Sequence, residues 1–300
     1  MTVRHTLLAL LVVVIWGLNF LAIDAGLDDM PPLLFLAIRF TFVVFPAIFF
    51  LRPPKIGWRN IVLIGGFLSL GQFALLYISL KLGMPPGLAS LLHQSQVVLT
   101  VIVAAVLLRE RPTRRQLLGI VIGMLGLAVV VAGHGQVAPW VPIVVLFGAS
   151  LSWAIGNVLT RRAQAPGSLS LVVWSGAVVP IPAFGLSLVV ESPDAVFSAL
   201  GNIGWPAVLS TLYTVVLSSL VGYGIWNHLI ATYPASAVVP FALLIPIVGI
   251  LAAWIAVGEQ PTLTEAVGGA VMLVGLAVAV IVWGRRATPL SPLPPPPAAP

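Results

Sequence analysis

The chain has 300 residues, of which 60% are hydrophobic and 7% are charged, and its mean hydropathy is +1.13. Soluble domains carry about a quarter charged residues, so this composition excludes a water-soluble fold. It supplies roughly nine or ten apolar helices of about 20 residues, so we expect the chain to lie almost entirely in a lipid bilayer. Without cysteine there are no disulfides and no thiolate metal ligands. The net charge of +6 does not indicate a nucleic-acid partner, because basic residues in such a chain mark cytoplasmic loops.

Ten apolar runs, separated by Pro, Gly and charged residues, predict ten membrane-spanning helices in an all-α fold. The first run stays apolar through Ile23 and lacks a small-residue cleavage site, so we expect a retained helix and not a signal peptide. The Pro-rich segment 287–300 is expected to form a disordered cytoplasmic tail. The ten runs cover residues 5–25, 32–51, 60–80, 86–107, 115–132, 140–161, 169–190, 206–231, 235–256 and 263–283.

The basic residues are distributed unequally between the two ends of these helices. With the N-terminus inside, twelve of the fourteen Lys and Arg residues fall on the cytoplasmic side, whereas Lys81 lies in an outer loop and Arg39 lies within the second span. Basic loops mark the cytoplasmic side of a membrane protein. The sequence therefore predicts that both termini are cytoplasmic, with Glu110 inside and Glu259 outside.

Residues 85–131 match residues 234–280 without gaps, at an offset of 149 residues. The match predicts two halves of five spans each, residues 1–135 and 136–286, and the odd number of spans requires the halves to have opposite orientations. Inverted repeats are common in secondary transporters, although channels and scaffolds also contain duplications. The informative pairs are Glu110/Glu259, Pro112/Pro261, Thr113/Thr262, Gly119/Gly268 and Gly126/Gly275.

Several motifs resemble the repeat of the drug/metabolite transporter superfamily, EamA type. One departure is Val97, which stands where the family usually has Pro, although the matching Pro246 is present. The resemblance implies a multi-pass exporter of amino acids or related metabolites in a bacterial inner membrane, similar to the YddG-like exporters of aromatic amino acids. The motifs are Trp16-Gly17-Leu18-Asn19-Phe20, Pro32, Arg39-Phe40 and Glu110-Arg111-Pro112-Thr113 in the first half, and Trp153, Asn157, Pro246 and Gly258-Glu259-Gln260-Pro261-Thr262 in the second.

Polar and aromatic residues recur at helical spacing inside the expected spans. Such groups are costly in lipid and usually face a bundle interior or a wet cavity. The alternative is that Asn, Gln and Ser join helices and that Trp and Tyr anchor the chain at the membrane surface. We interpret them as the lining of a mid-membrane substrate cavity. The candidate substrate-binding residues are Trp16, Asn19, Arg39, Gln72, His93, Gln96, Trp153, Asn157, Tyr223 and Trp226.

Arg39 is a permanent charge eight residues beyond Pro31, roughly 12 Å below the outer end of its helix at the rise of an α-helix. One interpretation is an arginine that extends outward to water or binds helix-end carbonyls. The other is a group that attracts a substrate carboxylate or phosphate. His93 lies at similar depth in the fourth span, so the sequence predicts that both residues line the outward half of the pathway.

The sequence lacks the motifs of several other function classes. It has no phosphate-binding loop and no zinc-protease or nucleophile-elbow motif, so an enzyme, a cofactor and a metal site are not expected. No carboxylate lies near mid-membrane, so facilitated diffusion is favoured over proton antiport. A lining of ring faces and neutral amides fits zwitterionic amino acids with aromatic or large apolar side chains. A broad drug/metabolite exporter, a channel and a membrane scaffold remain alternatives, and the sequence leaves the oligomeric state open.

Overall fold

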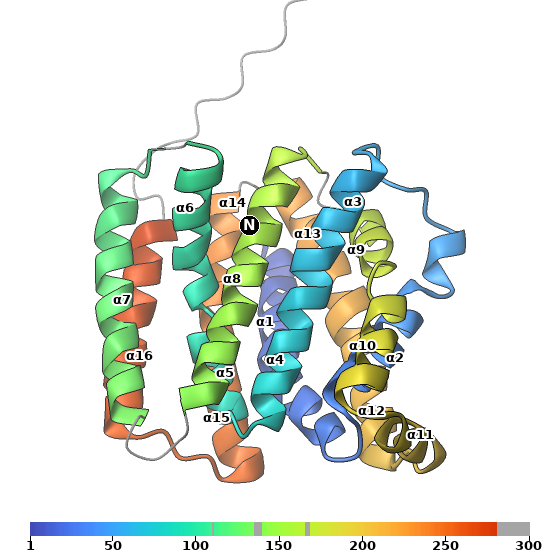
Figure 1. The fold of residues 1–300 in the computed structure, drawn as a ribbon. Coiled ribbons are helices and arrows are strands. Elements are labelled where there is room, and N and C mark those ends of the chain that lie inside the picture. The colour runs from blue at the N-terminus through green and yellow to red at the C-terminus, as the bar shows by residue number, and fades with distance from the viewer. Residues whose placement is uncertain (110, 135–139, 166–168, 234, 281–300) are drawn as a thin grey trace, which may run out of the picture.

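The computed structural model describes the chain except for residues 110, 135–139, 166–168, 234 and 281–300 (Figure 1). The expected tail at 287–300 therefore lies outside the described residues. Throughout the described part, the regular elements are helices and none is a strand. The elements are α1 (Val3–Leu27), α2 (Pro32–Val44), η1 (Ala47–Phe49), α3 (Trp58–Ile64), η2 (Gly65–Gly71), α4 (Gln72–Lys81), α5 (Pro86–Leu92), α6 (Ser95–Leu107), α7 (Arg114–His134), α8 (Trp140–Arg162), α9 (Leu169–Gly176), α10 (Pro180–Val190), α11 (Pro193–Gly201), α12 (Trp205–Leu212), η3 (Tyr213–Gly222), α13 (Tyr223–Thr232), α14 (Ala235–Val238), η4 (Val239–Leu244), α15 (Ile245–Val257) and α16 (Leu263–Val280).

The described elements combine into membrane-length helices at the predicted positions. Nine are long and apolar enough to cross a bilayer, and the shorter apolar helix Leu263–Ala279 follows them, so the ten-helix architecture is confirmed within the described residues. Two spans begin sharply after a Pro pair, at Pro32 and Pro86. Proline suits the first helical turn, where its missing N–H costs no intrahelical hydrogen bond.

The third and eighth spans each contain a π-helical segment, and these segments reveal the internal repeat. The 149-residue offset carries Gly65–Gly71 of η2 onto residues 214–220, which fall inside the π-helical Tyr213–Gly222 of η3. π-Helical turns are rare and concentrate at functional sites, so their recurrence at equivalent depths is not expected from composition. The two halves therefore share irregular backbone as well as sequence.

The loops that carry the repeated Glu-x-Pro-Thr motif are also built alike. The helix before each loop ends in a left-handed residue, Arg109 with φ 54° in one half and Gly258 with φ 71° in the other. The next helix starts with a reciprocal cap, in which the backbone N–H of Thr262 donates to Glu265 at 2.8 Å and the N–H of Glu265 donates to the Thr262 hydroxyl at 3.2 Å. Thr113 and Gln116 form the same pair of bonds before α7. The two loops lie at opposite ends of the bundle, as inverted repeats require (Figure 1).

The last helices of the two halves, α7 and α16, pack side by side at one edge of the bundle (Figure 1). Glycines allow the two backbones to touch: a Cβ on Gly126 would lie 2.3 Å from the backbone nitrogen of Met272, and one on Gly275 would lie 2.3 Å from that of Gly123. Small residues let helix backbones approach closely in lipid, where hydrocarbon exclusion does not drive association. The glycine spacing in these spans therefore serves helix packing.

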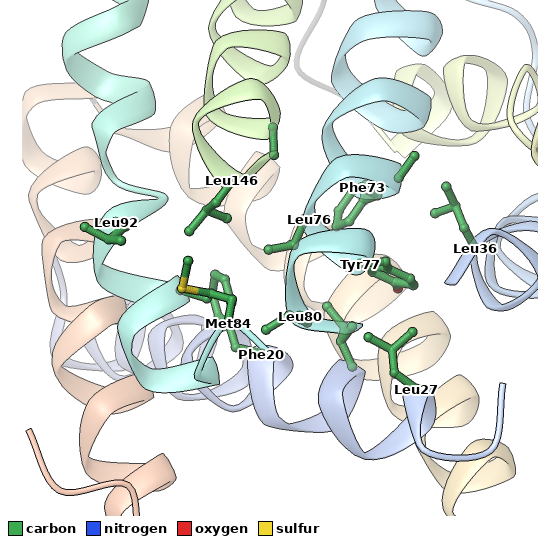
Figure 2. Packing of buried hydrophobic residues seen from close by; sticks show 14 of the residues in the cluster. Phe20, Leu27, Leu36, Phe73, Leu76, Tyr77, Leu80, Met84, Leu92 and Leu146 are labelled. Carbon is green, nitrogen blue, oxygen red and sulfur yellow. The ribbon is translucent and has the colours of Figure 1, made fainter. Parts of the chain in front are cut away.

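Helix α4 is buried on two faces and lies between two parts of the core (Figure 2). Phe73 and Tyr77 lie on the face toward Leu36 of α2, whereas Leu76 lies on the face toward Leu146 of α8. Side chains on these two faces belong to different clusters of the candidate site described below.

Candidate functional site

The fourth and ninth spans are both broken, and their breaks meet. In the fourth span, α5 ends at Leu92 and α6 starts at Ser95, and in the ninth span η4 separates α14 from α15. The Gln94 side-chain amide donates to the Ala242 carbonyl at 3.2 Å, so one break is bonded directly to the other. Broken helices free backbone polar groups at membrane depth, which is tolerated only where they are buried in protein or line a cavity.

The fourth span breaks although Val97 replaces the expected proline. Pro246 sits in the first turn of α15 on the far side of the symmetric break, whereas the first-half break relies on side chains. The His93 carbonyl accepts from the backbone N–H of Gln96 at 3.2 Å and also from the Ser150 hydroxyl at 3.4 Å. A polar neighbour on α8 thus stabilises the break where the sequence lacks proline.

His93 is at the centre of a buried group that we call the histidine cluster: Gln72, His93, Ser150 and Trp153. Its Nε2 lies 3.3 Å from the Gln72 amide and its Nδ1 lies 3.0 Å from the Ser150 hydroxyl. The Trp153 ring lies on the imidazole with centroids 5.0 Å apart. Three spans supply these groups, so the cluster ties the broken helix to α4 and α8.

A polar seam continues from this cluster along α6 and α8. The Asn157 amide donates to the Gln96 side-chain oxygen at 3.4 Å, one turn beyond Trp153. A further turn along, the seam ends in a recess of about 70 Å³ between α6, α8 and the start of α7, lined by Thr100, Val101, Ala104, Arg111, Pro112, Gln116 and Arg161. The seam therefore connects a buried centre with a basic recess near the end of the bundle.

Three of the predicted aromatic residues form a second group, the tryptophan cluster: Trp16, Tyr223 and Trp226. The Trp16 ring lies 5.1 Å from Tyr223 and 5.3 Å from Trp226, and its indole N–H donates to the Ser218 carbonyl at 3.1 Å. This carbonyl belongs to the π-helical η3, where i→i−4 bonding is disturbed. On the other side of α1, a Cβ on Gly17 would lie 2.6 Å from Val248 of α15. The cluster thus lies on α1 beside the broken ninth span.

Arg39 forms a third group with residues that the sequence analysis did not select. Its guanidinium donates to the Tyr77 hydroxyl at 2.9 Å and to the Ser219 hydroxyl at 3.1 Å, and its Cζ lies 4.3 Å from the centroid of Phe73. The side chain is 1% exposed. The expectation that Arg39 extends to water or binds helix-end carbonyls is therefore wrong, because neighbouring spans supply hydroxyls and a ring face inside the bundle.

The four aromatics that the sequence analysis placed around one cavity fall into two groups. The structure joins three of these aromatics on α1 and α13 but places Trp153 against His93 in the other cluster. Helices α4 and α5 each contact both α1 and α8, and the Phe20 ring of α1 lies 6.2 Å from the His93 ring. Asn19 is buried at 7% exposure, and its side-chain oxygen has no hydrogen-bond partner in the described structure.

Tyr77, Arg161 and Ser150 are among the residues of these groups that escaped the sequence analysis, and helical spacing was the available signal for the first two. Tyr77 follows Phe73 by four residues on α4, and Arg161 follows Asn157 by four on α8, so each shares a face with its neighbour. Ser150 gave no such signal, because serine is common where helices pack closely. Among the described residues, no three His, Asp or Glu side chains gather in a way that could hold a metal ion.

Two glutamates cap helix N-termini at the end of the bundle opposite the recess. The Glu259 carboxylate accepts from the backbone N–H of Gly87 and from that of Leu88, both at 2.9 Å. The Glu191 carboxylate accepts from Leu33 at 2.7 Å and from Leu34 at 3.3 Å. Each cap joins a first-half helix to a second-half carboxylate, and carboxylates at helix N-termini are favoured by unsatisfied N–H groups and the helix dipole.

Comparison with known proteins agrees with this arrangement of broken, repeated helices. The model of the EamA-like transporter family matches residues 4–132 and again residues 140–281. The chain belongs to the EamA-like transporter family. It is thus a multi-pass membrane transporter and not an enzyme.

Relatives align with this family member over nearly their full length. A protein of Salmonella typhimurium strain LT2 named probable amino-acid metabolite efflux pump is 38% identical, and the alignment covers 96% of this chain and 98% of the relative. A protein of the same name from Escherichia coli K12 is 36% identical, with 93% and 96% covered. One crystal structure with 21% identity has a TM-score of 0.61 over 93% of this chain and 97% of that chain, which supports the fold.

Proposed function

We propose that this transporter exports amino acids with aromatic or large apolar side chains across a bacterial inner membrane by alternating access. The observation that carries the proposal is the tryptophan cluster beside the crossing of two broken helices. Broken helices at a repeat interface are where transporters of inverted-repeat design bind their substrates. The names of the two enterobacterial relatives support amino-acid metabolites as the class of substrate.

The chemistry of the predicted residues favours an amphipathic, net-neutral solute. Ring faces at Trp16 and Tyr223 of the tryptophan cluster can contact an apolar side chain, and each aromatic pair adds roughly 0.5–1.5 kcal/mol beyond area burial. Amides at Asn19, Gln96 and Asn157 can hold a polar end. Poly-anions fit poorly, because desolvating a phosphate costs more than a single arginine returns.

Alternating access is supported by the matched irregular segments in the two halves. The π-helical segments η2 and η3 and the two breaks fall at equivalent positions of oppositely oriented repeats. Two equivalent packings of one duplicated sequence provide two states of similar free energy, one open to each side. We propose the boundaries 1–135 and 136–286 for these repeats.

The test is counterflow in proteoliposomes made with purified protein. We expect phenylalanine and tryptophan to exchange in a saturable, competitively inhibited manner, and glutamate and a sugar phosphate to exchange far more slowly. Preference for either anion would contradict the proposal, unsaturable flux would indicate a channel, and equal flux of all neutral solutes would indicate a broad metabolite exporter.

Replacing single tryptophans tests the site itself. Trp16→Leu is expected to weaken phenylalanine transport roughly tenfold through loss of ring contacts. Trp205→Leu is the matched control, because Trp205 is 77% exposed at the start of α12 and lies outside both clusters. Equal effects of the two substitutions would show that Trp16 acts only as a general packing residue.

A further inference from the structure

Arg39 is a buried permanent charge with an incomplete set of partners. Its two bonded nitrogens face the hydroxyls of Tyr77 and Ser219, and its Nε has no hydrogen-bond partner. The rings of Phe73 and Phe40 lie 4.3 Å and 5.6 Å from the guanidinium carbon. None of the Asp or Glu side chains in the described residues forms an ion pair with it. Hydroxyls and ring faces solvate the cation, but they do not neutralise it.

A charge held in this way is costly if its purpose is only structural. Buried charges are normally paired, and an unpaired charge in a membrane protein is expensive and marks a functional site by default. An unbranched apolar side chain would fill the space between α2, α4 and η3 without the desolvation cost. The positive charge therefore points to a negative group that binds beside it at some stage of transport.

The two hydroxyls that bind Arg39 differ in what they could offer an anion. The Ser219 hydroxyl donates to the Thr214 carbonyl at 2.8 Å, so it presents a lone pair to the guanidinium. The Tyr77 hydroxyl accepts from Arg39, which leaves its own proton to donate. The Nε–H of Arg39 on α2 and the O–H of Tyr77 on α4 are therefore two donors on helices that pack together.

We propose that Arg39, with Tyr77, is the binding site for the carboxylate of the transported amino acid and the group that excludes cationic amines. The inference rests on the proposed function, because it takes an amino acid as the substrate. Ser219, which accepts from Arg39, lies four residues before Tyr223, whose ring packs on Trp16. A carboxylate at Arg39 directs the substrate side chain toward the tryptophan cluster. The carboxylate reaches the guanidinium when α2 separates from η3, the element that supplies Ser219.

The test is competition against labelled phenylalanine, using ligands that share the phenyl ring and differ in whether they carry a carboxylate, an amine or both. We expect wild-type protein to bind phenylalanine and 3-phenylpropionate, which carry a carboxylate, and to reject phenylalaninamide and phenethylamine, which are cations without one. Arg39→Lys keeps the positive charge, so it should still prefer the two carboxylates over the two amines, although with lower affinity. Arg39→Met should weaken phenylalanine binding roughly 10- to 100-fold, the range for loss of a charge-assisted hydrogen bond, and should admit the amines.

Thermal stability distinguishes a binding role from a structural one. We expect Arg39→Met to raise the melting temperature of the purified protein, because it removes an uncompensated buried charge. A lower melting temperature with an unchanged preference for phenylalanine over phenylalaninamide would overturn the proposal. Arg59→Met is the matched control, since Arg59 is exposed in the first turn of α3, and both properties should stay at wild-type values.

A second variant keeps the proposal falsifiable if Arg39→Met does not fold. Tyr77→Phe retains the ring and removes only the hydroxyl, so phenylalanine affinity should fall several-fold while phenylalaninamide affinity stays unchanged. Equal changes for both ligands would overturn the assignment. Leucine and leucinamide separate the two proposals: discrimination between this pair without binding of any aromatic ligand would refute the proposed side-chain preference and support the Arg39 site.

Discussion

At the scale of single residues, the clearest asymmetry between the halves lies at two left-handed positions. Gly258 adopts φ 71° without strain, whereas Arg109 at the equivalent place adopts φ 54° with a full side chain. A left-handed residue is common where a helix ends, and glycine is favoured there because it has no Cβ. The first half therefore carries backbone strain that the second half avoids.

Exchanging these residues tests that difference. Arg109→Gly should stabilise the protein by roughly 1 kcal/mol, and Gly258→Arg should destabilise it by a similar amount. Steric crowding does not cause the expected destabilisation by Gly258→Arg, since a Cβ on Gly258 would meet no atom within 4 Å. Thermal unfolding of the purified variants in detergent measures both effects. A melting temperature that shifts in the same direction for both substitutions would contradict the backbone explanation.

At the scale of elements, the two glutamate caps hold broken and unbroken helices together at one end of the bundle. Glu259 and Glu191 each bind a pair of backbone N–H groups on a helix from the other half. These contacts bridge elements that must separate if that end opens. The caps therefore stabilise the state in which that end is closed.

Neutral substitutions at the caps should favour opening. Glu259→Gln weakens the charge–dipole contribution by about 1 kcal/mol, which corresponds to a roughly fivefold larger open population. A cysteine in place of Ser90 reports the open population, because this position is buried in the closed state. Ser90 is 1% exposed, and its hydroxyl donates to the Gly87 carbonyl at 2.6 Å. The chain has no other cysteine, so maleimide should label Ser90→Cys about five times faster when Glu259→Gln is also present.

The control for this measurement is Glu265→Gln. Glu265 caps the first turn of its own helix, through the N–H of Thr262, so Glu265→Gln should leave the labelling of Ser90→Cys unchanged. If Glu259→Gln and Glu265→Gln change the labelling rate of Ser90→Cys equally, then a general loss of stability, and not the cap between the halves, controls maleimide access to this position.

At the scale of the whole molecule, the described structure places the two motif loops at opposite ends, and the charge distribution predicts which end is cytoplasmic (Figure 1). A cysteine at Gln260 should react with a membrane-impermeant maleimide from outside the cell. A cysteine at Arg111 should react only after the inner face is made accessible. Both positions are exposed, so burial does not limit either reaction. Labelling of Gln260→Cys from the cytoplasm alone would refute the predicted orientation.

The sequence alone determined the ten helices, their boundaries to within a few residues and the inverted repeat. These features depend on local physics, because apolar runs, Pro pairs and helix-capping residues act over a single turn or a single span. The same rules located the polar residues inside the spans. They did not show whether a polar group would bind a substrate or a neighbouring helix.

Only the tertiary structure decided which polar groups are partners. Arg39 bonds to Tyr77, 38 residues away, and to Ser219, 180 residues away, and the choice depends on how α2, α4 and η3 cross. The tertiary structure also placed Trp153 against His93 and Trp226 against Trp16. It paired Gln94 with Ala242, so that the two helix breaks are bonded to each other. A buried polar group without a partner is costly in lipid, but helix packing angles, which no local pattern encodes, determine which partner it finds.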